Sequence, residues 1–281
     1  MRTELECIPC ALRQTLRAIR FSGSGRGEEA MRRALRVLLE ADWSVPPMAL
    51  GFDLFAALRE ELGVDDPYRA EKERHNRMLA ERYGELKQIV AESGDPLDAA
   101  VRMSIAGNVI DYGSHEGFDV WATIRRFLGE KPAVYEIDDL RRSLRSASTV
   151  MVFLDNAGEA VLDLLLAETI KELYGVERII AVARAEPMIN DVTVEEARAL
   201  GFDRLGEVRG VPTRGVGEWL RFQPTLHEWL AEADVAIAKG QGNFELLSGL
   251  GRGVYFLFTV KCPVVERIVG APQGSMVLKR I

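Results

Sequence analysis

The sequence predicts an α/β protein with a doubly wound, mostly parallel sheet in a Rossmann-like three-layer arrangement, together with an N-terminal helical subdomain. Two observations lead to this prediction. Residues 1–106 carry apolar side chains at helical spacing, whereas over residues 107–281 short apolar and β-branched runs alternate with helical segments. We therefore expect a helical subdomain at 1–106 and an α/β domain at 107–281 that carries the functional site.

The first hundred residues are predicted to be helical because their apolar residues recur every three or four positions. The expected helices are Cys10–Phe21, Glu28–Ala41, Ala49–Leu62, Tyr68–Ser93 and Pro96–Ala106. The last of these has a clear start, since Asp95 is suited to cap a helix whose first residue is a proline. The glycine-rich segment 22–27 follows no strand, so we expect a flexible connection there rather than a nucleotide-binding loop.

The second part of the chain contains five runs that predict strands. These are Thr149–Leu154, Arg178–Ala183, Ala233–Ala238, Val254–Val260 and Met276–Arg280. Helices are expected at Glu159–Tyr174, Val194–Leu200 and Glu245–Leu250, and a loop-rich stretch over 201–217. Strands that are apolar throughout are typical of a parallel sheet covered on both faces. Ligands bind beyond the carboxyl ends of such strands, so the residues that follow each strand are the functional candidates.

Composition and charge exclude several classes of protein. The 281 residues are 47% hydrophobic and 28% charged, as in an ordinary globular protein. A formal charge of -7 argues against a general nucleic-acid binder. No apolar run reaches the roughly 18 residues of a membrane span, and the first residues lack the apolar core of a secretory signal. We therefore expect a cytoplasmic protein without a membrane partner.

Oxygen-bearing side chains follow two strands that are predicted to be neighbours. Asp155 and Asn156 come directly after the first run, and Gly158 allows the backbone there to approach a ligand closely. A carboxylate next to an amide oxygen suits Mg²⁺ or Mn²⁺, although either residue could simply cap the next helix. Asp191, after the second run, is also suited to capping, but its position beside the first pair favours a third oxygen ligand.

Two of the seven lysines end apolar strands. Lys239 is followed by Gly240 and Gly242, whose backbone N–H groups can cradle an anion at the start of a helix. The alternative is a tight glycine turn beside an incidental lysine. Lys261 closes the run Val254–Val260, where a buried ammonium group would keep its charge beside a dianion. The pattern favours phosphate binding by both lysines.

Other candidates are less specific. Asn108 and Asp111 lie where the helical part joins the sheet and could line the cleft, but turn and capping roles are equally plausible. Cys7 and Cys10 are separated by two residues, and with Cys262 they could form a soft-metal or redox site. The pattern favours the simpler hypothesis that they are reduced structural thiols. An odd number of three cysteines also makes a disulfide framework improbable.

Taken together, these segments resemble the metal-dependent damage-control phosphatases, the family first catalogued as domain of unknown function eighty-nine. The similarity spans nearly the whole chain, and although each motif is weak alone, their order and spacing make the set specific. The matching segments are Glu6–Cys10, Gly107–Asp111, Asp155–Glu159, Asn190–Thr193, Lys239–Asn243 and Lys261–Cys262. The N-terminal Cys-x-x-Cys pair resembles the prokaryotic, chiefly archaeal, branch.

The resemblance implies that metal-activated water hydrolyses small phosphomonoesters, such as sugar phosphates or damaged phosphometabolites. It implies a divalent ion, Mn²⁺, Mg²⁺, Co²⁺ or Ni²⁺, held by Asp155, Asn156 and Asp191. Catalysis is assigned to these three residues and Lys239. Substrate contacts are assigned to Asn108, Asp111, Glu159, Lys239, Gly240, Gly242, Asn243 and Lys261. An aspartyl-phosphate on Asp155 is less favoured, because that carboxylate is already committed to the metal and no Asp-x-Asp pattern is present.

Two other classes of protein remain as alternatives. One is a metal- or nucleotide-binding Rossmann-like module that performs no chemistry. The other is a methyltransferase on a similar sheet, which needs a glycine-rich turn after the first strand. Residues 155–158 supply only one glycine for such a turn.

Overall fold

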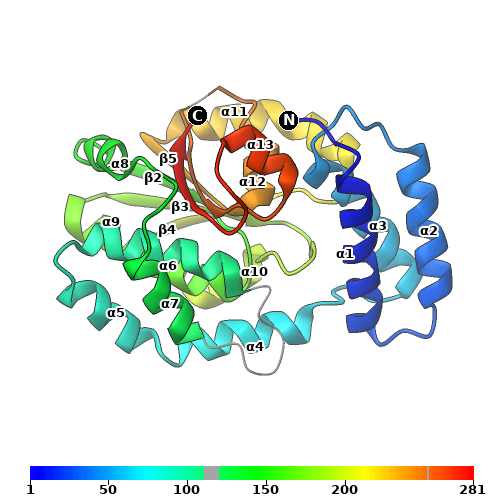
Figure 1. The fold of residues 1–281 in the computed structure, drawn as a ribbon, viewed down its shortest axis with the longest axis horizontal. Helices are drawn as coiled ribbons and strands as arrows, with labels where there is room; N and C mark the ends of the chain where they lie inside the picture. Colours follow the sequence, from blue (N-terminus) through cyan, green and yellow to red (C-terminus); the bar gives the residue numbers. More distant parts are fainter. Residues whose placement is uncertain (111–119, 252) are drawn as a thin grey trace.

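The computed structural model describes residues 1–110, 120–251 and 253–281. A seven-stranded sheet forms the middle layer, with helices on both of its faces (Figure 1). The strands lie in the order β1-β7-β6-β5-β2-β3-β4, and every neighbouring pair is parallel except β6 and β7. This arrangement confirms the predicted α/β fold with a mostly parallel sheet.

The strands are β1 (Val134–Tyr135), β2 (Thr149–Phe153), β3 (Arg178–Arg184), β4 (Gly206–Val211), β5 (Val235–Lys239), β6 (Tyr255–Thr259) and β7 (Met276–Arg280). The helices up to the first strands are α1 (Cys7–Ser22), α2 (Gly27–Glu40), α3 (Pro47–Leu62), α4 (Arg69–Ala80), α5 (Tyr83–Glu92), α6 (Pro96–Ile110), α7 (Val120–Gly129) and α8 (Ile137–Leu144). Those that follow are α9 (Glu159–Tyr174), α10 (Val194–Leu200), the short 3-10 helix η2 (Phe202–Arg204), α11 (Val216–Glu232), α12 (Gly240–Leu247) and α13 (Pro263–Val269).

The sheet is apolar on both faces because successive residues of a strand point in opposite directions. In β2, Val150 and Val152 belong to the core that includes α5, α6 and α9. Met151 and Phe153 belong to the core that includes α1–α3, α11 and α12. None of these four side chains is more than 2% exposed. A continuous apolar run therefore serves two hydrophobic cores at once, which anchors the strand that leads into the site.

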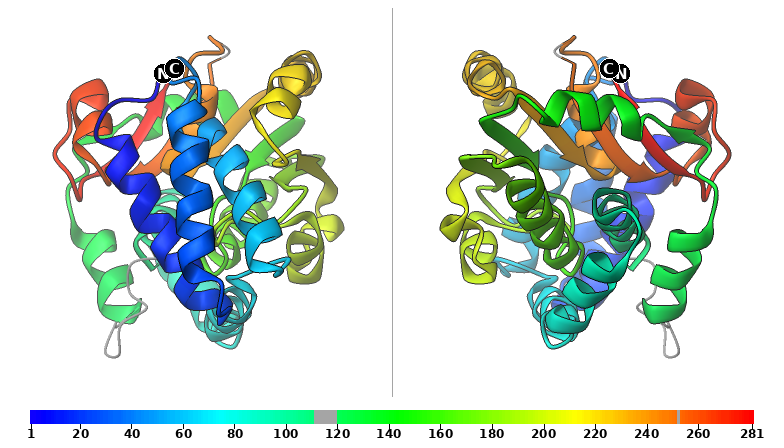
Figure 2. Two further views of the ribbon diagram at one scale, coloured as in Figure 1. Left: turned by 90° about the vertical axis from the view of Figure 1, so that its right-hand side faces the viewer. Right: turned by 90° about the vertical axis from the view of Figure 1, so that its left-hand side faces the viewer.

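The N-terminal helices are divided between the two faces of the sheet. Helices α1–α3 pack on one face, while α5 and α6 pack with α9 on the other, as the opposite views of Figure 2 show. Helix α4 connects the two groups (Figure 1). The predicted boundary between residues 106 and 107 falls inside the continuous helix α6. Residues 1–106 therefore contribute to both cores.

Several elements differ from the sequence-based prediction. The stretch 201–217, predicted to be loop-rich, contains β4. Among the described strands β4 pairs with β3 alone, at the edge of the sheet, and such a strand tolerates polar residues. The helix predicted over Tyr68–Ser93 is two helices, because Arg82, with φ −108° and ψ 10°, departs from helical geometry. Asp95 does cap α6 as predicted, accepting a hydrogen bond from the backbone N–H of Asp98 at 3.2 Å. Among the described residues, no helix combines the length and apolar character needed to cross a membrane.

Candidate active site

The carboxyl ends of β6, β5, β2 and β3 lie side by side at one edge of the sheet, and the predicted site residues follow them there. Asp155 and Asn156, just after β2, are only 5% and 4% exposed. The Asn156 Nδ2 group donates to Asp155 Oδ2 at 2.7 Å and to Glu159 Oε2 at 2.9 Å. Because the amide nitrogen faces these two carboxylates, the amide oxygen is presented on the opposite side.

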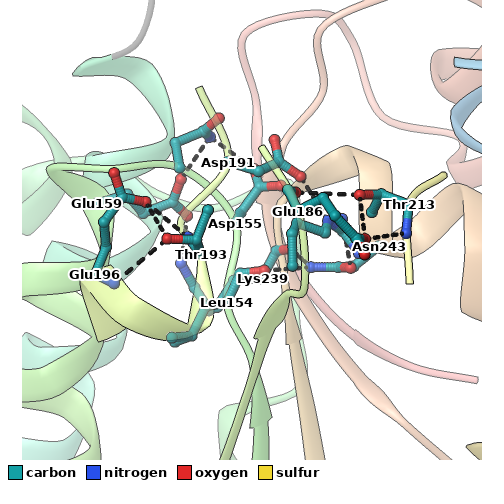
Figure 3. Close-up of polar contacts among 12 residues, drawn as sticks. Leu154, Asp155, Glu159, Glu186, Asp191, Thr193, Glu196, Thr213, Lys239 and Asn243 are labelled. Atoms are coloured by element: carbon teal, nitrogen blue, oxygen red, sulfur yellow. Dashed lines mark hydrogen bonds and ion pairs between the residues drawn. The ribbon is translucent and has the colours of Figure 1, made fainter. Parts of the chain in front are cut away.

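The loop after β3 brings Asp191 against the same segment (Figure 3). Asn156 and Asp191 form an antiparallel bridge, and backbone hydrogen bonds of 2.8 and 2.9 Å join the two loops. The Asp191 carboxylate accepts a hydrogen bond from Arg184 Nε at 2.7 Å, and both side chains are buried. The three residues that were predicted to hold a metal are therefore brought together, and their loops are fixed to each other through the backbone.

The surroundings of Asp155 oppose its ionisation. Burial raises the pKa of this carboxyl well above its ordinary value, and the charges of Glu159 and Asp191 raise it further. Lys261 and Arg184 lower the pKa but do not offset the increase. A buried carboxylate in this setting is stabilised in its ionised form by a bound cation.

The donor atoms at this edge fit a hard divalent cation. Among the residues that the structure describes, no three His, Cys, Asp or Glu side chains are grouped as a metal site. The available set is instead two carboxylates and one amide oxygen, from Asp155, Asp191 and Asn156. Mg²⁺ in particular is usually bound by few protein oxygens and keeps several of its waters. The chemistry of the donor set is thus compatible with such an ion and does not select one metal.

Gly240, the first residue of α12, lies directly against Asp155. Its φ is +75°, and a Cβ atom added there would lie 1.8 Å from Asp155 Oδ2. Glycine is therefore needed both for the left-handed backbone and for the close approach to the carboxylate. The other predicted glycine, Gly242, faces the Met48 side chain, with its added Cβ 3.3 Å from the sulfur.

Replacing Gly240 by alanine should displace the Asp155 carboxylate and strain the backbone. We expect the free energy of unfolding to fall by about 1–3 kcal/mol, as for a residue forced into a sparsely populated region of φ and ψ. Thermal stabilisation by Mn²⁺ should be lost as well, because the carboxylate would move. Gly249→Ala is the matched control, since a Cβ atom there meets nothing within 4 Å. Equal Mn²⁺ stabilisation in Gly240→Ala and wild type would contradict this role.

The sequence predicts that Lys239 binds phosphate, but in the structure its side chain points into the protein. Its ammonium group is 0% exposed and contacts Glu159 Oε1 at 2.6 Å, Asp163 Oδ1 at 2.8 Å and the Ser104 carbonyl at 3.0 Å. Three acceptors use all three of its donors. Burial by itself lowers the pKa of Lys239, but the Asp163 and Glu159 charges outweigh burial and raise it. The ammonium group is therefore charged and is buried inside the protein, where it contacts groups of the protein only.

Two asparagines support this arrangement from either side. Asn108 Nδ2, fully buried, donates to Asp155 Oδ2 at 2.9 Å and to Glu159 Oε2 at 3.0 Å. Asn243 Nδ2 donates to the backbone carbonyls of Leu154 and Lys239 at 2.9 and 2.7 Å. Asn108, Glu159 and Asn243, all predicted to contact substrate, thus bind the carboxylates and strand ends of the site itself. Two predicted contacts remain. Lys261 is partly exposed and follows the end of β6, whereas Asp111 lies outside the described residues.

The network also contains residues that the sequence analysis did not select. Asp163 and Ser104 join Lys239 from two helices, with Ser104 Oγ donating to Asp163 Oδ1 at 2.7 Å. An acidic residue in the middle of the largely apolar helix α9 is the one signal that could have revealed Asp163. Arg184, the last residue of β3, binds the Asp191 carboxylate and also donates to Asn243 Oδ1 at 3.0 Å.

Helix α4 contacts both of the loops that carry the predicted metal ligands. Asn76 Oδ1 accepts a hydrogen bond from the backbone N–H of Gly158 at 2.6 Å, in the loop that carries Asp155. Lys72, fully buried, is 3.0 Å from Glu196 and donates to the Asp191 carbonyl at 3.4 Å. A helix of the N-terminal region therefore belongs to the site.

We expect Asn76→Ala to leave the Gly158 N–H without its acceptor and to lower the free energy of unfolding by about 1–3 kcal/mol. Because the affected loop carries Asp155 and Asn156, thermal stabilisation by Mn²⁺ should weaken in parallel. Asn76→Asp retains the accepting oxygen and should recover most of the stability. If Asn76→Ala matched wild type in urea unfolding and in the Mn²⁺ shift, α4 would have no role in holding the loop.

The three cysteines are all unpaired and partly exposed. Cys7 and Cys10 lie in the first turn of α1. Cys262 directly precedes α13, and its Sγ atom accepts a hydrogen bond from Gln241 Nε2 at 3.4 Å. Burial, together with neighbouring groups that include Glu245 and the other two thiols, raises the pKa of Cys7 to about 11 and also raises that of Cys10. The thiols of Cys7 and Cys10 are therefore protonated near neutral pH, and all three thiols lie close enough for their charges to influence one another.

A protonated thiol is a poor nucleophile, so Cys7 and Cys10 should react slowly with iodoacetamide. At pH 8 we expect alkylation of the folded protein at least about tenfold slower than alkylation in urea, where the thiols have their ordinary pKa. Mass spectrometry of timed samples measures both rates. Fast labelling of either residue in the folded protein would show a stabilised thiolate and favour the redox alternative.

The fold and this edge of the sheet define a Rossmann-like α/β protein with a buried cluster of carboxylate and amide oxygens at the ends of its central strands. The profile of the damage-control phosphatase ARMT1-like domain matches residues 3–277, and the chain belongs to this family. It is 32% identical to the damage-control phosphatase PH1575 of Pyrococcus horikoshii, over 100% of this chain and 98% of that protein. It is 36% identical to a damage-control phosphatase of Archaeoglobus fulgidus, over 89% of this chain and 88% of the relative.

A solved structure agrees with these similarities. The crystal structure of a DUF89 family protein from Pyrococcus horikoshii superimposes with a TM-score of 0.88 at 30% identity, covering 100% of this chain and 99% of that one. The family and the phosphatase class predicted from the sequence are thereby confirmed. The metal, the site residues and the significance of the Cys-x-x-Cys pair stay predictions.

Proposed function

We propose that this chain hydrolyses small phosphomonoesters, such as sugar phosphates or damaged phosphorylated metabolites, and that the reaction depends on Mn²⁺, Mg²⁺, Co²⁺ or Ni²⁺. The observation that carries the proposal is the meeting of Asp155, Asn156 and Asp191 on two loops joined by backbone hydrogen bonds. The raised pKa of Asp155 supports it, because a cation would relieve the repulsion among these carboxylates. A small phosphorylated metabolite is the expected partner.

Asp155, Asn156 and Asp191 are the proposed ligands of the ion, which when bound would neutralise phosphoryl charge and activate a water molecule. Asn108 and Asn156 hold the Asp155 carboxylate through their Nδ2 groups. Arg184 holds Asp191 in the same way. The ligand oxygens are thus oriented before any substrate arrives, which is the property that makes electrostatic stabilisation effective.

We assign the phosphate contact to Lys261 rather than to Lys239. Lys261 is partly exposed, follows the end of β6, and lies close enough for its charge to lower the pKa of Asp155. Its backbone N–H donates to Gln241 Oε1 at 3.0 Å, which ties it to the glycine-containing start of α12. Lys239 has a positioning role, because its three donors are already taken by groups of the protein.

The two alternative classes have less support. A methyltransferase is disfavoured by membership in a phosphatase family and by the single glycine after β2. A binding module without chemistry would need the same cation, so only turnover separates it from an enzyme.

The deciding experiment is hydrolysis of p-nitrophenyl phosphate by the EDTA-treated chain, with Mg²⁺, Mn²⁺, Co²⁺ and Ni²⁺ added separately. We expect no turnover in EDTA and recovery with at least one ion. A panel of sugar phosphates then defines the preferred substrate. Unchanged turnover in EDTA would contradict the metal requirement. Thermal stabilisation by an ion without hydrolysis of any compound would favour the binding module.

A further inference from the structure

A pocket with a volume of about 490 Å³ opens beside the ligand loops, between the end of α3 and the loops that follow β3 and β4. Arg59 and Glu60 line it from the last turn of α3, and Asp65 lies just beyond that helix. Glu186 and Arg214 line the other side. A pocket of this size is suited to a small metabolite or to part of one.

One of the two arginines that line the pocket forms an ion pair with a described residue, and the other does not. Glu186 binds Arg214 Nε at 2.7 Å and accepts a hydrogen bond from the Thr213 backbone N–H at 3.0 Å. Arg59 is partly buried and forms no ion pair with any residue that the structure describes. Its Nε atom is buried without a hydrogen-bond partner, and its Nη1 atom makes only a long contact of 3.5 Å with the Pro187 carbonyl.

An unpaired guanidinium group with a buried, unused donor is unfavourable unless an anion completes its hydrogen bonds. Arginine is also the side chain best shaped to bind a carboxylate or phosphate through two donors at once. Glu60 and Asp65 are exposed at the edge of the pocket, where water screens their charges. Arg59 is therefore the group in this pocket that is best suited to bind an anion.

One loop that lines the pocket leads along the chain into the candidate active site. The loop that begins with Glu186 and Pro187 ends at Asp191, whose backbone N–H donates to the Met188 carbonyl at 2.9 Å. Within this loop Ile189 has a φ of +48°, which a β-branched residue rarely adopts. Such strain is typical of segments whose conformation serves a site. A ligand at Arg59 would thus bind one end of the loop whose other end carries Asp191.

We propose that this pocket binds a second anionic group, a carboxylate or a phosphoryl group, on the part of the substrate that does not react, and that Arg59 is the residue that recognises it. The proposal rests on the proposed function and narrows its substrate class to phosphomonoesters that carry a further negative charge. The same chemistry would bind a separate small anion, so the test must distinguish these two sources.

The experiment compares 3-phosphoglycerate with glycerol 3-phosphate, which differ by the carboxylate, in wild type, Arg59→Met and Arg59→Lys. We expect wild type to favour 3-phosphoglycerate in KM, and Arg59→Met to raise that KM about tenfold or more, as for loss of a charged hydrogen bond. The KM for glycerol 3-phosphate should hardly change. Arg59→Lys should recover part of the preference. Arg33→Met, an exposed residue of α2 that does not line the pocket, is the control.

A second measurement does not depend on turnover. Malonate, which has carboxylates but no phosphoryl group, should stabilise wild type in thermal unfolding and should stabilise Arg59→Met less. If malonate stabilises wild type more than Arg59→Met while the ratio of the two KM values is the same in both proteins, the anion is a separate ligand, and the assignment to substrate is wrong. If wild type and Arg59→Met have the same ratio of KM for 3-phosphoglycerate to KM for glycerol 3-phosphate, and the same thermal shift with malonate, then the pocket does not bind an anion through Arg59. If p-nitrophenyl phosphate is hydrolysed but neither ester is, the assignment to substrate is wrong. If p-nitrophenyl phosphate is not hydrolysed with any ion either, the proposed function fails, and the malonate result alone decides the pocket.

Discussion

Replacing Asp155 by asparagine should abolish phosphatase activity while leaving the metal-free protein at least as stable as wild type. The expected loss in kcat/KM is at least about 10²–10³, the effect of removing one group that stabilises transition-state charge. The stability result follows from the position of the carboxyl, since burial and the charges of Glu159 and Asp191 oppose its ionisation. The neutral amide removes that repulsion, and its oxygen can still accept hydrogen bonds from Asn108 and Asn156.

Two measurements check this prediction separately. Urea unfolding in EDTA reports the metal-free stability, and thermal unfolding with and without Mn²⁺ reports binding, which Asp155→Asn should weaken strongly. Asp203→Asn, an exposed residue of η2, controls for the general effect of removing one negative charge. Wild-type activity in Asp155→Asn would disprove its role as a ligand. Marked destabilisation in EDTA would mean that the carboxylate has a structural function that its neighbours do not reveal.

The residues best predicted from the sequence are those whose position follows directly from the strands. Asp155 and Asn156 come just after an apolar run, and Asp191 lies in the loop that follows the next run. Parallel strands end at the same edge of a sheet, so the meeting of these residues could be anticipated. The strand β4 could not, because an edge strand with one partner can carry polar residues and lacks the apolar run that marks the central strands. The contacts of α4 with the loops also leave no local pattern, since Lys72 and Asn76 meet residues more than eighty positions away.

Lys239 shows why a correct position does not fix a role. The sequence places it correctly at the end of β5, but the direction of its side chain depends on α6 and α9, which supply Ser104, Glu159 and Asp163. None of these is near it in sequence. A lysine at the end of an apolar strand can extend toward a ligand, or it can turn inward to acidic groups of the protein. Which orientation it takes depends on how helices distant in the sequence pack beside it.

The two strand-end lysines should therefore respond oppositely to substitution. In Lys239→Met, Glu159 and Asp163 would lose the ammonium group that neutralises them, although both are fully buried. Removing one partner of a buried ion pair typically costs 3–5 kcal/mol, so we expect a loss of about that size in the free energy of unfolding. Adding Asp163→Asn should restore part of it, because one uncompensated charge is removed.

Lys261→Met should instead change stability by about 1 kcal/mol or less, because this lysine is partly exposed and the Lys239 network is left intact. Its kcat/KM for p-nitrophenyl phosphate should fall by about 10²–10³, since the group proposed to stabilise phosphoryl charge is lost. Binding of Mn²⁺, measured by thermal shift, should not weaken, because removal of a cation beside Asp155 does not remove a ligand. The comparison separates the two roles by combining urea unfolding with kinetics on the same proteins. If Lys239→Met kept wild-type stability and lost activity, while Lys261→Met remained fully active, the phosphate contact would belong to Lys239 after all.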